Sequence, residues 1–131
     1  MPDAWSPGEL ELIDRADELE IAPQRPDGRR MWVPIWVVRV DGDVYLRTWH
    51  RRDTGWFGRA VSSQRARIRV PGLEREVRVD DVGVGDERMR AGIDAAYTTK
   101  YGRYGGATVD RMTNDDAAAA TLRMVALSDA R

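Results

Sequence analysis

The longest apolar segment of the chain spans residues 32–40, with the sequence WVPIWVVRV. An almost continuous β-branched and aromatic run is typical of a strand in the middle of a sheet, covered on both faces. Residues 41–43 (Asp-Gly-Asp) indicate a turn, after which residues 44–49 return as the second strand of a β-hairpin. Side chains of the returning strand alternate, with Val44, Leu46 and Thr48 on one face and Tyr45, Arg47 and Trp49 on the other.

Shorter segments elsewhere show the same alternation of apolar and polar residues. Leu19 and Ile21 predict one half-buried strand, and residues 66–70 and 74–79 predict a second hairpin about Pro71-Gly72. Residues 122–127 predict a final strand. The chain is therefore expected to hold about six strands.

Helical signals lie between these strands. Ser6 and Glu9 form a capping-box pattern that predicts a helix over 7–17. Asp53 or Thr54 can cap a short helix that carries Trp56, and Asp86 opens a longer helix for which Gly102 is expected as a left-handed C-terminal cap. A brief turn over 115–120 brings the expected number of helices to three or four.

The order of these elements predicts the fold class. Neighbouring strands are close enough in sequence to pair antiparallel, which favours a single α+β domain over residues 1–131, built as a split antiparallel β-barrel. No glycine fingerprint joins a strand to a helix, so a dinucleotide-binding parallel sheet is disfavoured.

Composition narrows the possible functions. The chain has no Cys and one His, which excludes disulfides and thiolate or His-only metal sites, and no metal site is predicted. The N-terminal residues are acidic, and no stretch approaches the roughly 18 apolar residues that a membrane span needs. We expect a cytoplasmic protein with no membrane contact.

The charges are unevenly placed, although the formal net charge is −1. Residues 44–70 hold seven Arg and one acid, a balance of +6, while the other 104 residues hold 14 basic and 21 acidic groups, a balance of −7. The acidic remainder and the lack of a recognised motif argue against nucleic acid as a partner. A small anionic ligand is the alternative that fits a local basic region.

The strongest candidate site lies in residues 45–52, where a strand ends and a capped helix begins. A phosphate placed there would meet guanidinium groups, the Thr48 hydroxyl and free N–H groups of the helix N-terminus. Trp49 and Trp56 could add flat apolar surface for a ring system. The competing interpretation is that Tyr45 and Trp49 pack an inner or dimer face while the arginines are solvated. His50 has no visible orienting partner, so no catalytic residue is assigned.

A second candidate is the segment 97–106, which places three tyrosines around Lys100, the only lysine of the chain. Tyr97 and Tyr101 are four residues apart and share a helix face with nearby Tyr104. Binding is one interpretation; packing into the core or across a subunit boundary is the other.

These segments carry a family resemblance. The sequences RPDGR at 25–29, PIWVV at 34–38 and YLRT at 45–48, with Gly55-Trp56, resemble the domain of unknown function 2255 family. Its Tyr-x-x-Lys-Tyr-Gly-x-Tyr-Gly signature is matched by residues 97–105. That family in turn resembles the flavin-binding split barrels, and especially the deazaflavin-dependent nitroreductase branch.

The resemblance implies a homodimeric split barrel that holds FMN or coenzyme F420. By position, Trp36 would lie near the cofactor ring, Arg47, Thr48, Arg51 and Arg52 would hold phosphate, and Trp56 would wall the pocket. Two positions depart from the nitroreductase branch: Trp49-His50-Arg51 replaces a Lys-Gly-Gly loop, and Arg59 replaces an Asn. Two functions follow: a flavin- or deazaflavin-binding oxidoreductase-like protein, or a non-catalytic split-barrel module for a small anion or a protein partner.

Overall fold

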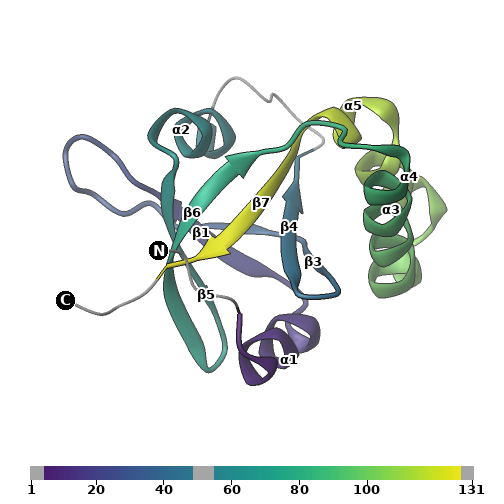
Figure 1. Cartoon of the computed structure of the whole chain (residues 1–131), viewed down its shortest axis with the longest axis horizontal. Coiled ribbons are helices and arrows are strands. Elements are labelled where there is room, and N and C mark those ends of the chain that lie inside the picture. The colour runs from purple at the N-terminus through teal and green to yellow at the C-terminus, as the bar shows by residue number, and fades with distance from the viewer. Residues whose placement is uncertain (1–4, 49–54, 128–131) are drawn as a thin grey trace.

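The computed structural model describes residues 5–48 and 55–127, whose strands form one antiparallel sheet in the order β2-β1-β5-β6-β7-β4-β3 (Figure 1). The strands are β1 (Leu19–Pro23), β2 (Val33–Ile35), β3 (Val37–Val40), β4 (Asp43–Arg47), β5 (Arg65–Val70), β6 (Leu73–Asp81) and β7 (Thr121–Ala126). The second hairpin is confirmed, with Val70 opposite Leu73.

The single strand expected over 32–40 is in fact two strands separated by Trp36. Residue Pro34 of β2 pairs with Glu20 of β1, whereas Val38 of β3 pairs with Tyr45 of β4. Because β2 and β3 form the two edges of the sheet, one residue connects both edges and the sheet curls into a nearly closed barrel. A uniformly apolar run contains no alternation that could mark this change of pairing partner.

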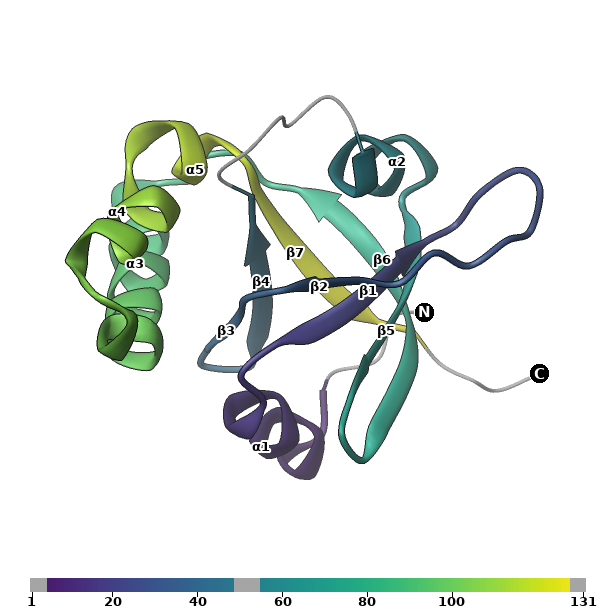
Figure 2. The same cartoon turned by 180° about the vertical axis from the view of Figure 1, so that it is seen from behind.

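Among the described residues, five α-helices surround the barrel, one or two more than expected. They are α1 (Pro7–Arg15), α2 (Gly55–Ser63), α3 (Glu87–Tyr101), α4 (Gly106–Thr113) and α5 (Asp115–Ala119). Figures 1 and 2 show α1 and α2 at opposite ends of the barrel, with α3, α4 and α5 grouped on one side of it. The capping box of α1 is confirmed, with Ser6 and Glu9 bonded in both directions.

The C-terminal end of α3 differs from the prediction. Gly102 has a right-handed φ of −57° and continues into a short 3₁₀ turn, η1 (Gly102–Tyr104). The positive φ of this region, +100°, falls at Gly105, immediately before α4. The segment YGRYGG contains three glycines, any of which can adopt a positive φ. The sequence alone therefore did not show which of them does so.

Two apolar cores lie on the two sides of the sheet. The barrel interior contains Val44 and Leu46, together with Phe57 of α2 and Ile13 of α1. The outer core lies between the β3–β4 hairpin and α3–α4, and contains Tyr45. The predicted alternation along β4 is therefore confirmed. In the described part of the chain, no helix is long and apolar enough to cross a membrane.

Candidate functional site

Arg47, the last residue of β4, is fully buried beneath α3 and α4. Its Nε donates to Thr121 Oγ1 at 2.9 Å, and its Nη1 donates to Asp94 Oδ1 at 2.5 Å and to the Met112 carbonyl at 2.9 Å. The guanidinium carbon also lies 5.7 Å from the centre of the Tyr97 ring. Arg47 thus ties β4 to β7, α3 and α4. We call this set of contacts the Arg47 network.

Burial keeps the Arg47 guanidinium away from any ligand in solution. Its Nη2 is the one buried side-chain nitrogen or oxygen without a hydrogen-bond partner in the described part of the chain. No guanidinium surface is exposed, however, so a phosphate could reach Arg47 only if the Arg47 network opened. Sequence alternation correctly placed Arg47 on the same face of β4 as Tyr45, but it could not show that two helices cover that face.

The other residues predicted to contact phosphate lie nearby in sequence. Thr48 is buried and its N–H donates to the Ala120 carbonyl at 3.4 Å. Trp49, Arg51 and Arg52 lie outside the described residues. Their predicted contacts with a phosphate stay predictions.

Trp36 and Trp56, both half-buried, pack against different cores. Trp36 lies flat on Tyr101, with ring centres 4.0 Å apart and planes 2° apart, as part of the outer core. Trp56 packs against the barrel core and meets Phe57 edge-on at 5.6 Å. The structure does not place the two indoles in one cluster.

The tyrosine and lysine segment at the end of α3 holds backbone groups of the barrel. The hydroxyl of Tyr97 accepts the Arg47 N–H at 3.0 Å, and the hydroxyl of Tyr101 accepts the Val37 N–H at 3.0 Å. The Lys100 amine donates to the Ile13 carbonyl at 2.9 Å and to the Val37 carbonyl at 3.0 Å. These contacts satisfy backbone groups of Val37 beside the bend, of Arg47 at the end of β4 and of Ile13 in α1. Packing is therefore the role that the structure gives to this segment.

Burial changes the acidity of these groups. It raises the pKa of the Tyr97 and Tyr101 hydroxyls well above their usual range. Burial also lowers the pKa of the Lys100 amine to about 8, against the opposing effect of the Asp14 and Asp17 carboxylates.

An open cleft of about 490 Å³ lies between α2 and the segment that follows β1. It is lined by Gln24, Arg25, Pro26, Gly55, Gly58, Arg59, Ser62 and Ser63. No carboxylate is among these described lining residues. We call it the α2 cleft.

Its two arginines differ in their surroundings. Arg25 lies 3.6 Å from Asp27, whereas Arg59 is exposed and has no ion-pair partner among residues 5–48 and 55–127. Gly55 begins α2, so the first N–H groups of that helix lie at the same cleft. The two guanidinium groups and the helix N-terminus suit an anion. Ser62 and Ser63 lie at the opposite, C-terminal end of α2, where the Ser63 hydroxyl is bonded to the Arg59 and Arg65 carbonyls.

Sequence reasoning did not assign Arg25, Arg59, Ser62 or Ser63 to a site. Arg59 was noted only as a departure from a family pattern, although its lack of an acidic neighbour one helical turn away was a usable signal. Arg25 lies far from it in sequence, and only the pairing of β1 with β5 brings the two elements together.

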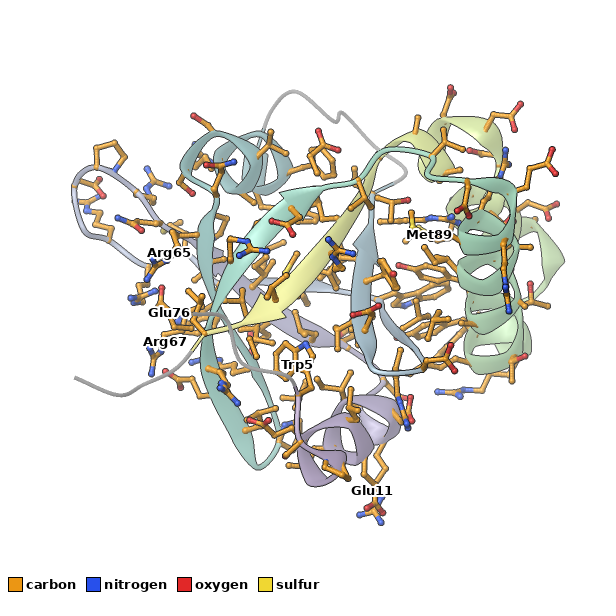
Figure 3. All side chains as sticks on the ribbon, in the orientation of Figure 1. Trp5, Glu11, Arg65, Arg67, Glu76 and Met89 are labelled. Carbon is orange, nitrogen blue, oxygen red and sulfur yellow. The ribbon has the colours of Figure 1, made fainter. Side chains whose placement is uncertain are left out.

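Two of the seven arginines of residues 44–70 pair with acids from neighbouring strands. Arg67 contacts Glu74 at 2.6 Å and Glu76 at 3.1 Å, and Arg69 contacts Glu20 at 2.8 Å. Figure 3 shows Arg67 and Glu76 close together on the outside of the barrel, with Arg65 nearer to α2. At Arg67 and Arg69 the positive charge seen in the sequence is therefore balanced by carboxylates.

The strands of residues 5–48 and 55–127 form a seven-stranded, nearly closed split barrel with helices over its ends and one side. The chain belongs to the DUF2255 family, described as an uncharacterized protein conserved in bacteria, whose pattern matches residues 9–124. No curated protein matches the sequence.

Solved structures with the same fold are distant in sequence. A FAD-binding protein from Mesorhizobium loti has a TM-score of 0.61 at 14% identity, over 98% of this chain and 94% of its own. A putative 5-nitroimidazole antibiotic resistance protein from Bacteroides thetaiotaomicron has a TM-score of 0.61 at 14% identity, over 99% and 84%. A conserved hypothetical protein from Mycobacterium tuberculosis has a TM-score of 0.60 at 14% identity, over 96% and 82%. At this identity the likeness shows the fold alone.

Proposed function

We propose that this protein binds a phosphorylated flavin or deazaflavin, FMN or F420, and acts as an oxidoreductase-like protein. The observation that carries the proposal is the α2 cleft, a carboxylate-free group of described residues with two arginines, on a split-barrel fold. The FAD-binding protein that shares the fold agrees with a flavin-type ligand, although only at the level of fold.

In this proposal Arg59 and Arg25 hold the phosphate, because charge-assisted hydrogen bonds from guanidinium groups are the strongest phosphate contacts a side chain offers. Ser62 adds a hydroxyl donor from the same helix, whereas the Ser63 hydroxyl is already bonded to the Arg59 and Arg65 carbonyls. The segment that precedes α2 in the chain completes the phosphate site with Thr48, Trp49, Arg51 and Arg52. Arg47 acts indirectly, since its network fixes the end of β4 from which this segment departs.

Trp36 and Trp56 have different roles in this proposal. Trp56 walls the barrel side of the pocket. Trp36 would meet a cofactor ring only at the part that Tyr101 leaves uncovered, since one of its faces is stacked. The bound cofactor supplies the redox chemistry, and the protein supplies orientation and exclusion of water. A homodimer in the cytoplasm remains part of the proposal.

A visible absorption spectrum of the purified protein, with mass analysis of anything released by denaturant, tests the proposal directly. In thermal-shift titrations FMN or F420 should stabilise the chain, while riboflavin, which lacks the phosphate, should do so much less.

Arg59→Gln should weaken FMN or F420 binding about tenfold, because one charge-assisted contact is lost. Arg88→Gln on α3, which removes an exposed arginine remote from the cleft in sequence and fold, is the matched control. Equal losses in the two variants would contradict a site at the α2 cleft.

The second candidate is a non-catalytic split-barrel module for a small anion or a protein partner. Two observations favour it: Arg47 is used inside the fold, and Trp36 is stacked on Tyr101. This function predicts a colourless protein that inorganic phosphate stabilises but FMN and F420 do not.

A further inference from the structure

A second hollow of the surface lies between α1, β3 and α3, away from the α2 cleft. This groove has a volume of about 380 Å³. Val38 and Val40 of β3 and Ala96 of α3 contribute apolar surface, and the Asp14–Arg39 ion pair, 2.9 Å long, joins α1 to β3 beside it. Lys100, the only lysine of the chain, also lines it.

The amine of Lys100 is held by backbone groups rather than by a carboxylate. Its Nζ lies 2.9 Å from the Ile13 carbonyl and 3.0 Å from the Val37 carbonyl, and it has no ion-pair partner in the described part of the chain. A neutral amine has two N–H groups and one lone pair. Both hydrogen bonds can therefore persist in the neutral form, which leaves the lone pair as the free position of a fixed nitrogen.

The surroundings shift the protonation equilibrium of Lys100 toward that neutral form. Burial is the largest influence on the amine and lowers its pKa to about 8; Arg103 acts in the same direction, while Asp14 and Asp17 oppose it. An ordinary lysine has a pKa near 10.4 and holds almost no free amine at neutral pH. Desolvation of this kind is one of the recognised ways to activate a lysine nucleophile.

We propose that Lys100 is an acylation site, whose amine attacks the carbonyl carbon of an activated acyl group, an acyl phosphate or an acyl thioester, held in this groove. The new C–N bond is an amide. The bond from the carbonyl carbon to the phosphate oxygen or thiol sulfur breaks, and the proton lost by nitrogen leaves with that group or with water. No oxidant or reductant takes part.

Acylation has a structural consequence. An amide nitrogen carries one N–H and no charge, so the modified side chain can keep only one of its two bonds to the Ile13 and Val37 carbonyls. Those bonds connect α1 and β3 to α3. Modification should therefore loosen the packing of α1 against the barrel.

The test uses the full chain with acetyl phosphate in one arm and an acetyl thioester of N-acetylcysteamine in the other. Acetylation of Lys100 is followed by peptide mass analysis at pH 7.5, for the native protein and for the same chain unfolded in urea. We expect native Lys100 to react at least about fivefold faster than unfolded Lys100 in one arm or both, because the neutral fraction is larger in the folded state. The reactive arm identifies the donor class.

Asp14→Asn should accelerate the reaction further, since it removes a carboxylate that favours the ammonium form. The α-amino group, mapped on its own peptide, reports reagent strength in every sample. Native acetylation no faster than that of the unfolded chain in both arms would overturn the proposal and leave Lys100 with a purely structural role.

Discussion

Arg47 and Arg59 belong to the same basic stretch of sequence, yet they occupy opposite kinds of environment. Arg47 is fully buried and shares Asp94 with Arg90, whereas Arg59 is exposed at the α2 cleft without an ion-pair partner among the described residues. A buried guanidinium with fixed partners supports the fold, while an exposed one beside a cleft is available to a ligand. The comparison shows that a count of arginines does not locate a binding site.

The largest effect is expected for Arg47→Met. Among the described residues, this change leaves Asp94 with Arg90 alone and takes the Arg47 donor from the Met112 carbonyl, and removing one member of a buried ion pair typically costs about 3–5 kcal/mol. Urea denaturation measures the free energy of unfolding. Arg47→Lys keeps the charge and should lose less. A stability unchanged by Arg47→Met would show that the Arg47 network contributes nothing.

Tyr101→Phe comes next. It removes the hydroxyl that accepts the Val37 N–H and donates to the Asp17 carbonyl, and an unsatisfied buried backbone group costs about 1–3 kcal/mol. Tyr104→Phe is the matched control, because Tyr104 is 47% exposed and should change stability by less than about 0.5 kcal/mol. Similar losses at both positions would mean that Tyr101 does not hold the strand bend.

The pH dependence of stability separates the lysine from the tyrosines. The folded pKa of Lys100 lies below its ordinary value of 10.5, so between about 8 and 10.5 the unfolded chain binds more protons and stability should rise with pH. Tyr97 and Tyr101 have folded pKa values raised above 10.0, so above that pH the folded chain binds more protons and stability should fall. Urea midpoints measured from pH 7 to 11 test both slopes, and Lys100→Met should abolish the first.

The smallest effect on stability is expected for Arg59→Gln. An exposed arginine with no ion-pair partner among residues 5–48 and 55–127 should change the free energy of unfolding by less than about 0.5 kcal/mol. The same variant is expected to lose ligand affinity, so stability and binding should separate at Arg59 and coincide at Arg47. A large loss of stability in Arg59→Gln would remove the contrast between the two regions.

Local pattern predicted the elements well. Capping residues identified α1 and α3, the alternation along β4 assigned both of its faces, and the hairpin at Pro71-Gly72 has the expected register. The division at Trp36 was missed because its neighbours are apolar on both sides. The helix α4 was missed because its N-terminal cap is Gly105, a residue that carries no side-chain cap.

The candidate site was less accessible to sequence reasoning. The segment before α2 was identified as basic, but the cleft also needs Arg25, which is 34 positions from Arg59 and approaches it through the pairing of β1 with β5. The signature at residues 97–105 was recognised as a pattern. Its hydrogen bonds to Val37, beside the bend at Trp36, and to Arg47, at the end of β4, depend on the packing of α3 against the sheet, which the sequence did not reveal.

The sequence by itself determined which segments become strands and helices and which side of each strand is apolar, because caps, turns and periodicity act between residues close in the chain. Tertiary structure alone decided which charges meet. The partners of Arg47 are 47 to 74 positions away, and the free energy of an ion pair depends on distance and burial in space. Arginine therefore connects buried elements of the fold at position 47 and is a candidate ligand-binding group at position 59.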